Sequence, residues 1–199
     1  MSHLIGITGT IGSGKSTIGA ILEKRGIPVI DTDKLVHKLF VDDKNVIAAI
    51  IHRFGKDVLH ADGTVDRVKL GALVFSDAVA RKSLETIVHP ATIMACRKEV
   101  ERLKDNALVA ILVPLLFEAG LQDEYNEIWT SYTDEKVLKE RLKNRDKFDE
   151  AEIERRLAAQ LSQKEKCARA THVIDNSGTL TETERQVNEL LAHLNQPKL

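Results

Sequence analysis

The stretch "GTIGSGKST", residues 9–17, follows directly on the apolar run "LIGIT", residues 4–8. Residues 9–16 match the phosphate-binding pattern G-x-x-x-x-G-K-[ST] at every fixed position. The apolar run has the length of a strand that is covered on both faces. After the pattern, apolar side chains recur at helical spacing up to Gly26, so we expect a helix over residues 15–25. A phosphate-binding loop between a buried strand and a helix predicts an α/β nucleotide-binding fold.

The residue types of this loop suit a nucleoside triphosphate. Its glycines admit positive φ angles and leave no side chain between the main chain and a ligand. Successive N–H groups then point inward at a helix N-terminus, where an anion is favoured. We expect Lys15 to reach the β- and γ-phosphates and the Ser16 hydroxyl to ligate Mg²⁺. The alternative is a glycine-rich turn that includes a lysine by chance.

Four further segments predict strands separated by helical sequence. These segments, only one of which is apolar throughout, cover residues 28–31, 107–113, 127–132 and 172–175. The run 107–113, "ALVAILV", is the most hydrophobic, and we expect it to be the central strand. Buried strands that alternate with helices predict a central parallel sheet wound by helices on both faces.

Residues 34–106 interrupt that alternation, since they contain no convincing strand. One apolar stripe ends at Gly55 and consists of Val46, Ile47, Ile50, Ile51 and Phe54. Asp66 and Ser76 are expected to be the N-caps of two more helices. A crossover of about 70 residues is much longer than a βαβ unit requires, so we predict a helical lobe beside the sheet.

The composition limits the classes of function. The chain has 199 residues, 43% hydrophobic and 30% charged, which is enough for one core with a smaller lobe. The net charge of −1 provides no basic field for nucleic acid or an anionic membrane. Cys96 and Cys167 form no C-x-x-C pair, and we find neither a signal-peptide pattern nor an apolar membrane span. We expect a cytoplasmic protein, a monomer or a weak homo-oligomer, that binds neither nucleic acid nor membranes.

Two other nucleotide-binding classes fit the motifs less well. A GTPase switch needs a D-x-x-G motif between the phosphate loop and the guanine motif. Here "DNSG", residues 175–178, comes after "NRD", residues 144–146, which also lacks the guanine-motif lysine. An ordinary ATPase normally has an acid at the end of a buried strand, but residues 107–113 continue into "PLLFE", where Glu118 is the first acid.

The positive evidence for a kinase begins with "DTD", residues 31–33, at the end of the second predicted strand. Ligands of open α/β sheets bind beyond the carboxyl ends of the strands. An alcohol acceptor needs a group that orients and deprotonates it, and we assign that role to Asp33. Asp31 is expected to support Mg²⁺ through water. The alternative for both is that they cap a helix beginning near Lys34.

The second kinase signal is a charged helical insert over residues 141–169, with "DKFDE", residues 146–150, as its only expected break. Arg141 and Arg145 are four residues apart, so a helix places them on one face. Arg156 and Gln160 repeat that spacing. Guanidinium groups on a flap can close over the triphosphate and exclude water, as a kinase requires. The alternative is that these arginines are only solvated.

Over essentially its whole length the chain resembles the dephospho-coenzyme A kinase family. The resemblance is carried by "GITGTIGSGKST", "VIDTD", "DRVKLGALVF", "LETIVHP", "VPLLFE", "ERLKNR", "RRLAAQ" and "HVIDNSG". The order "LETIVHP", then "VPLLFE", is its most specific part.

The resemblance implies transfer of the ATP γ-phosphoryl group to the ribose 3′-hydroxyl of dephospho-CoA, the last step of coenzyme A synthesis, with Mg²⁺. It implies one domain over residues 1–199 with a P-loop nucleotide-kinase fold. The nucleotide-binding core would take about 1–33, 107–140 and 170–199, the helical substrate lobe about 34–106, and the lid about 141–169.

The resemblance also assigns site residues. The ATP phosphates are held by Gly12, Ser13, Gly14, Lys15, Ser16 and Thr17. The remaining assignments are Asp33 at the acceptor hydroxyl, Arg141 in the lid, Asn176 and Gly178 by the adenine, and Arg67, Arg81, His89 and Leu116 at the substrate. Arg145 joins Arg141 at the ATP on the strength of the shared helix face alone.

Several of these assignments have structural alternatives. His89 would instead pack at a helix start before Pro90, Arg67 and Arg81 would lie in solvent, and Leu116 would belong to the core. Thr171 replaces an aspartate usual in the family, which leaves the contacts of that acid in question. A kinase of the same architecture with another acceptor, such as a nucleoside monophosphate, and a non-enzymatic nucleotide-binding adaptor are the competing functions.

Overall fold

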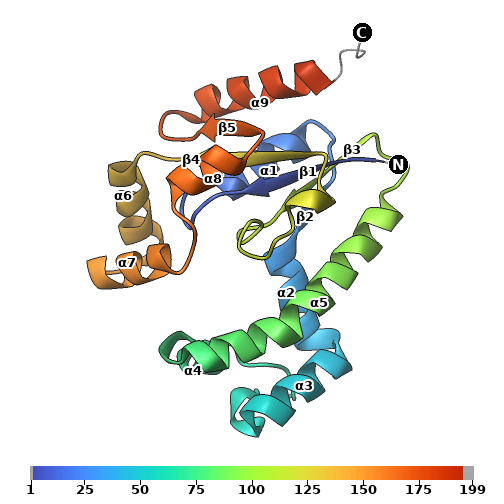
Figure 1. Ribbon diagram of the computed structural model, residues 1–199, viewed down its shortest axis with the longest axis vertical. Helices are drawn as coiled ribbons and strands as arrows, with labels where there is room; N and C mark the ends of the chain where they lie inside the picture. The colour runs from blue at the N-terminus through green and yellow to red at the C-terminus, as the bar shows by residue number, and fades with distance from the viewer. Residues whose placement is uncertain (1, 195–199) are drawn as a thin grey trace. The chain divides into compact units, whose positions relative to one another are not determined.

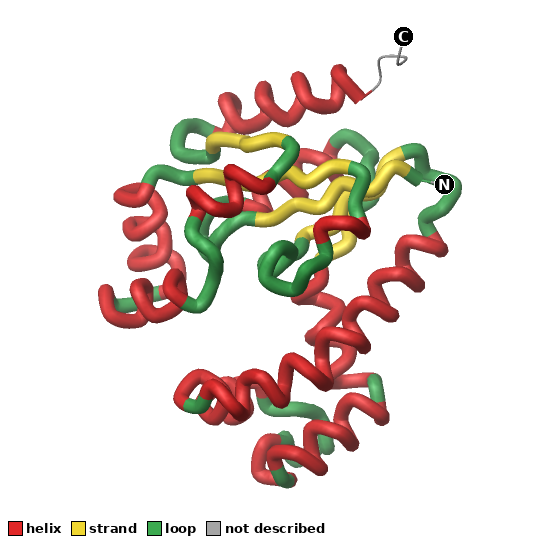
Figure 2. The backbone as a smooth tube through the Cα atoms, in the orientation of Figure 1, coloured by secondary structure: helices red, strands yellow, loops and turns green. Residues whose placement is uncertain are grey.

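The computed structural model describes residues 2–194, and of Phe75 and Ser76 it describes the backbone alone. The chain divides into two compact units. The first unit consists of Met1–Ile30 with Leu103–Leu199, and the second is Asp31–Arg102. Figures 1 and 2 show the sheet of the first unit and the helices of both.

The first unit is built on a five-stranded sheet. Its strands are β1 (His3–Thr8), β2 (Val29–Asp31, whose last residue begins the second unit), β3 (Leu108–Leu112), β4 (Glu127–Tyr132) and β5 (His172–Asp175), in the order β2-β3-β1-β4-β5. The pairs β1–β3, β1–β4 and β4–β5 are parallel, which confirms the predicted sheet. β1, and not β3, is the middle strand. Because both strands are flanked on two sides and buried, hydrophobicity alone did not tell which of them is central.

Helices cover both faces of this sheet. The helices that contact the strands are α1 (Lys15–Lys24), α8 (Gln163–Arg169) and α9 (Leu180–Leu194). The helices α6 (Glu135–Asp146) and α7 (Glu150–Ala158) pack on each other beside one end of the sheet (Figure 1), and a short 3₁₀ turn, η2 (Gln122–Glu124), precedes β4. In Figure 1, α8 lies in front of the strands and α1 lies behind them. The core between strands and helices includes Ile5, Ile18, Trp129, Ile174 and Val187, all of them completely buried. This packing fixes the end of β1, from which the phosphate loop leaves.

The charged insert differs from its prediction at one point. The expected break lies between α6 and α7, where Lys147 adopts φ = 58°. A second break, between α7 and α8, was missed. Ser162 and Glu165 form a capping box that starts α8 anew. Gln160 therefore lies outside a helix, so the expected helical pairing of Arg156 with Gln160 is wrong.

The second unit is helical, as predicted. It contains α2 (Thr32–Asp42), α3 (Lys44–Phe54), η1 (Lys56–Val58), α4 (Arg67–Ser76) and α5 (Ala78–Arg102). Its own core includes Phe40, Val46, Ile50, Leu70 and Val88. Aspartates cap its helices: Asp31 on α2, Asp43 on α3 and Asp66 on α4.

Two expectations for the second unit are wrong. The backbone of Ser76 ends α4, and Asp77 accepts the N–H groups of Val79 and Ala80 at the start of α5 instead. His89 and Pro90 lie inside α5, not at a helix start. A proline inside a helix removes one main-chain donor and crowds the carbonyl four residues earlier, yet α5 continues through Pro90. Within residues 2–194, no helix has the length and apolar character needed to cross a membrane.

Candidate active site

The phosphate loop turns sharply between β1 and α1, and three glycines make that turn possible. Gly9, Gly12 and Gly14 have φ angles of 146°, 79° and 104°. A Cβ at Gly14 would lie 1.8 Å from Asn176 Nδ2, and a Cβ at Gly9 would lie 2.3 Å from Ser131 Oγ. The glycines are therefore required both by the backbone angles and by close neighbours.

The loop is held from behind by buried polar groups. The Ser13 hydroxyl is completely buried, donates to Thr10 O at 2.8 Å and shares a 2.5 Å hydrogen bond with the Ser131 hydroxyl. The Ser13 carbonyl accepts from Thr133 Oγ1 at 2.8 Å and from Asn176 Nδ2 at 2.9 Å. The side chain of Ser13 thus faces the protein, which leaves only its main chain for a ligand.

The N-terminus of α1 is suited to an anion. Its N-cap is Gly14, which offers no side-chain cap, and within this described helix the first turn contains no acid. Lys15 is half-buried, and its Nζ donates to Gly9 O at 2.8 Å and to Thr10 O at 3.0 Å. Ser16 is exposed in the first turn, and Thr17 follows it half-buried.

The start of α1 also offers one ligand for a magnesium ion. Among the described residues no group of three or more His, Cys, Asp and Glu side chains could hold a metal. Mg²⁺ usually takes one or two protein ligands together with phosphate oxygens and water. The exposed Ser16 hydroxyl, beside an anion-binding helix end, fits such a partial ligand set.

Arg141 and Asn176 come together behind the loop. The Arg141 guanidinium donates to Asn176 O at 2.8 Å and to Thr133 Oγ1 at 3.2 Å. Asn176 is 5% exposed, and its Oδ1 accepts from Thr183 Oγ1 at 3.0 Å. The Asn176 amide, predicted at the adenine, is thus bonded to the loop and to α9. Gly178 lies exposed two residues further on, next to Glu182.

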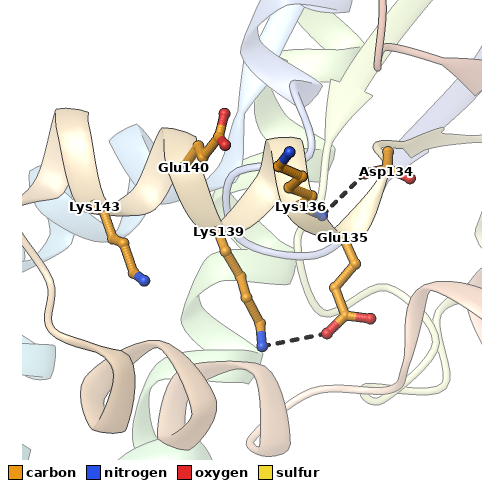
Figure 3. Close-up of a pocket in the computed structure, with 6 residues that line it drawn as sticks. All are labelled: Asp134, Glu135, Lys136, Lys139, Glu140 and Lys143. Carbon is orange, nitrogen blue, oxygen red and sulfur yellow. Dashed lines mark hydrogen bonds and ion pairs between the residues drawn. The ribbon is translucent and has the colours of Figure 1, made fainter.

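Arg145 shares one face of α6 with Arg141, and both line a hollow with Val137, Glu140 and Asn144. Arg145 is exposed and pairs with Asp146 at 2.9 Å. A neighbouring hollow on α6 is lined by Asp134, Glu135, Lys136, Lys139, Glu140 and Lys143 (Figure 3).

The charges of this neighbouring hollow are largely neutralised. Lys139 Nζ lies 3.2 Å from Glu150 Oε1 and 3.3 Å from Glu135 Oε1, and Lys143 also pairs with Glu150. Hydrogen bonding to Glu150 and Glu135 raises the pKa of Lys139. Because Lys139 and Lys143 already have carboxylate partners, this hollow is a poorer anion site than the helix end at Gly14.

In the second unit, Asp31 caps the N-terminus of α2, which was the alternative to its expected role at Mg²⁺. Its Oδ1 accepts from Asp33 N at 3.0 Å and from Lys34 N at 3.4 Å. The helix α2 begins at Thr32, earlier than expected, so Asp33 lies exposed in its first turn. Arg67 and Arg81 are exposed, and His89 is half-buried.

Leu116 and Thr171 both have structural contacts in the first unit. Leu116 is completely buried and packs against Gly6 of β1, as the core alternative predicts. Thr171 Oγ1 accepts the Ile128 N–H at 3.0 Å, so this threonine caps the start of β4. Packing and capping account for these two side chains without a ligand.

Sequence reasoning missed a polar anchor between the strands and the insert. Lys166 is completely buried, and its Nζ bonds to Pro114 O at 2.9 Å and to Glu118 Oε1 at 2.8 Å. Burial lowers the pKa of Lys166, and the bond to Glu118 opposes that shift. The stretch "QKEKCAR" contains two lysines in a charged helix, so no pattern distinguished the buried one.

Replacing Gly14 should damage the loop. We expect Gly14→Ala to lower the free energy of unfolding by at least about 2 kcal/mol, because it adds a contact with Asn176 to an unfavourable φ angle. Gly26→Ala is the matched control, since φ is 77° and its Cβ would meet no described atom within 4 Å. In that control the free energy of unfolding should fall by only about 1 kcal/mol. Equal losses in denaturant unfolding would contradict the close approach of Asn176 to the loop.

Breaking the buried ion pair should also be costly. We expect Glu118→Ala to lower the free energy of unfolding by about 3 kcal/mol, because the Lys166 ammonium would remain buried without its charged partner. The control is Glu189→Ala, which breaks the exposed Arg185–Glu189 pair and should change the free energy of unfolding by less than about 0.5 kcal/mol. A loss for Glu118→Ala as small as that of the control would show that the pair does not anchor α8.

A phosphate loop at the end of β1, in a five-stranded sheet of order β2-β3-β1-β4-β5, defines a P-loop kinase. The crystal structure of shikimate kinase from Aquifex aeolicus shares this fold, with a TM-score of 0.51 at 19% identity over 96% of this chain and 95% of that one. The dephospho-CoA kinase of Campylobacter jejuni superposes with a TM-score of 0.73, at 26% identity over 98% of both chains.

The sequence comparisons identify the family. The family model described as dephospho-CoA kinase matches residues 3–182. A protein of Shouchella clausii named dephospho-CoA kinase is 42% identical over 94% of this chain and 96% of its own length. The chain belongs to the dephospho-CoA kinase family, which phosphorylates dephospho-CoA to CoA in the last step of CoA biosynthesis, with ATP as the phosphate donor.

Proposed function

We propose that this chain transfers the γ-phosphoryl group of ATP to the ribose 3′-hydroxyl of dephospho-CoA. The observation that carries this proposal is the uncapped N-terminus of α1 behind the phosphate loop, in a chain matched by the family model over residues 3–182. An uncapped helix N-terminus presents free N–H groups to which a phosphate group can bind. The family supplies the acceptor, which the loop alone does not specify.

The proposed ATP site is the loop with its neighbours on the first unit. The main chain of residues 12–17 cradles the phosphates, and Lys15 leaves the carbonyls of Gly9 and Thr10 to meet the β- and γ-phosphates. Mg²⁺ would be held by the Ser16 hydroxyl, and it neutralises phosphate charge when bound. The adenine lies near Gly178 and the main chain of Asn176.

The proposed lid comprises residues 141–169. Arg141 is bonded next to the loop in this structure, and Arg145 lies on the same face of α6. We propose that both guanidinium groups meet the transferring phosphoryl group when ATP is bound. Lid closure excludes water, which would otherwise accept the phosphoryl group in place of the alcohol.

The proposed acceptor site uses Asp33 and the helical substrate lobe expected over about residues 34–106, most of which belongs to the second unit. Asp33 is exposed in the first turn of α2, and there it orients the 3′-hydroxyl and accepts its proton. Arg67 and Arg81 are exposed cations available to the substrate's phosphates, and His89 is the half-buried polar group of α5. Catalysis is then mainly positioning and charge stabilisation.

We also propose a cytoplasmic location and a monomer or weak homo-oligomer. The sequence holds two cysteines, Cys96 and Cys167, and no disulfide joins them, which supports a reducing compartment. Burial raises the pKa of Cys167, which argues against a reactive thiolate there.

ATP consumption with different acceptors tests the function. The purified protein should consume ATP with dephospho-CoA and release ADP and CoA in equal amounts. Adenosine, AMP and buffer without acceptor should each give less than about a hundredth of that rate, a discrimination within reach of one binding site. Faster consumption with AMP would indicate a nucleotide kinase, and consumption with none of them would favour a non-enzymatic adaptor.

A further inference from the structure

One main-chain donor of the phosphate loop is bonded to the proposed lid. The Ile11 N–H donates to Gln160 Oε1 at 3.1 Å, across 149 positions of sequence. Gln160 lies in the turn between α7 and α8, so its side chain reaches the loop from outside any helix. This contact is polar, partly buried and directed at the loop that the ATP site uses.

The same part of the loop is also held by apolar contacts. The side chain of Ile11 packs against the cluster that joins α6 to α7, formed by Leu138, Leu142 and Ile153. Leu142 also lies close to Gly12, since a Cβ added at Gly12 would be 3.0 Å from Leu142 Cδ2. Residues 11 and 12 are therefore packed against the α6–α7 hairpin by the Ile11 side chain and by the close approach of Leu142 to Gly12, while the Ile11 N–H is bonded to Gln160 just beyond α7.

Gln160 reaches the loop from a fixed base. The next residue, Leu161, donates its N–H to Glu118 Oε1 at 2.8 Å, and the same carboxylate pairs with buried Lys166. Lys166 also donates to Pro114 O, which accepts from Thr8 Oγ1 at 3.2 Å. Because Thr8 ends β1, this network returns to the strand from which the phosphate loop starts.

We propose that Gln160 is a positioning residue that couples the α6–α7 hairpin to the phosphate loop through the Ile11 N–H. Leu161 is held to the sheet through Glu118 and Lys166, so Gln160 lies where the hairpin joins this base, and its bond to the Ile11 N–H transmits a shift of residues 11–12 to the end of α7. When the loop closes on phosphate, the hairpin that carries Arg141 and Arg145 follows. The inference rests on the proposed ATP site, and it adds the residue that links loop and lid.

The test compares Gln160→Met with Gln160→Glu, since only the glutamate can still accept the Ile11 N–H. Without nucleotide, hydrogen exchange at the Ile11 amide should be at least about tenfold faster in Gln160→Met, and within about threefold of wild type in Gln160→Glu. The dissociation constant of ATP for Gln160→Met should rise about fivefold to tenfold, the effect of one net hydrogen bond.

The matched control is Asn126→Leu. Asn126 Oδ1 accepts the Leu4 N–H at 2.7 Å, so it supports β1 at the end remote from the loop. The control should change neither Ile11 exchange nor ATP affinity by more than about twofold. Unchanged Ile11 exchange in Gln160→Met, unchanged ATP affinity, or equal effects in the control would each overturn the coupling.

A measurement on the wild-type protein covers the case in which Gln160→Met does not fold. ATP should slow hydrogen exchange at the Ile11 amide by at least about threefold, and an unchanged rate would overturn the proposal. No experiment in this set contains dephospho-CoA. A protein that shows the coupling but does not phosphorylate dephospho-CoA would therefore refute the proposed function alone.

Discussion

Asp33→Ala should lower turnover by about three orders of magnitude while the dissociation constant of ATP stays within about twofold of wild type. Asp33 is the acid in the first turn of α2, and it is exposed. Its proposed partner is the acceptor hydroxyl, whereas the phosphate loop, the proposed ATP site, belongs to the first unit. Steady-state kinetics with dephospho-CoA and equilibrium binding of ATP separate the two effects.

Asp42→Ala is the control for this prediction. Asp42 is an exposed acid at the other end of the same helix, so its loss removes a carboxylate without touching the proposed acceptor site. We expect its turnover to remain within about twofold of wild type, as for an ordinary surface position. If Asp33→Ala kept full turnover, the carboxylate would have no part in the chemistry.

Lys15→Ala should lower both ATP affinity and turnover, with kcat/KM falling by about 10³-fold. The Lys15 ammonium donates hydrogen bonds to the carbonyls of Gly9 and Thr10, which belong to the loop itself. Its proposed partners are the β- and γ-phosphates, and its charge is needed most while the phosphoryl group is transferred. The measurement is kcat/KM for ATP, combined with ATP binding in the absence of acceptor.

Ser13→Ala is the comparison within the same loop. The buried Ser13 hydroxyl is hydrogen-bonded to the Ser131 hydroxyl and to Thr10 O, so its loss should lower the free energy of unfolding by about 1–2 kcal/mol. Its effect on kcat/KM should be at least about tenfold smaller than that of Lys15→Ala, because its side chain faces away from the ligand. Equal losses in kcat/KM would contradict this orientation of the loop.

The strands and the phosphate loop were predictable because their signals are local. β4 and β5 have the limits expected for the segments "EIWTSY" and "HVID", and the loop is a contiguous motif. The middle position of β1 was not predictable from hydrophobicity, because β3 is equally flanked and buried. The break before α8 carried a local signal, the spacing of Ser162 and Glu165, that was overlooked.

The support of the site depends on contacts that no local pattern encodes. Asn176 bonds to Ser13 across 163 positions, and Gln160 bonds to Ile11 across 149. A polar residue in a charged stretch is ambiguous until the fold brings its partner beside it, as it does for Lys166. His89 was misplaced for a different reason, since the helix α5 continues through a proline that usually ends one.

A crystal structure with a non-hydrolysable ATP analogue and dephospho-CoA bound tests the central claim most directly. The distance to measure joins the carboxylate oxygens of Asp33 to the ribose 3′-oxygen. We predict about 2.6–3.2 Å, with that oxygen in line with the γ-phosphorus of a triphosphate held by residues 12–17. A carboxylate turned away from the ribose, with another group at the 3′-oxygen, would contradict the assignment of Asp33.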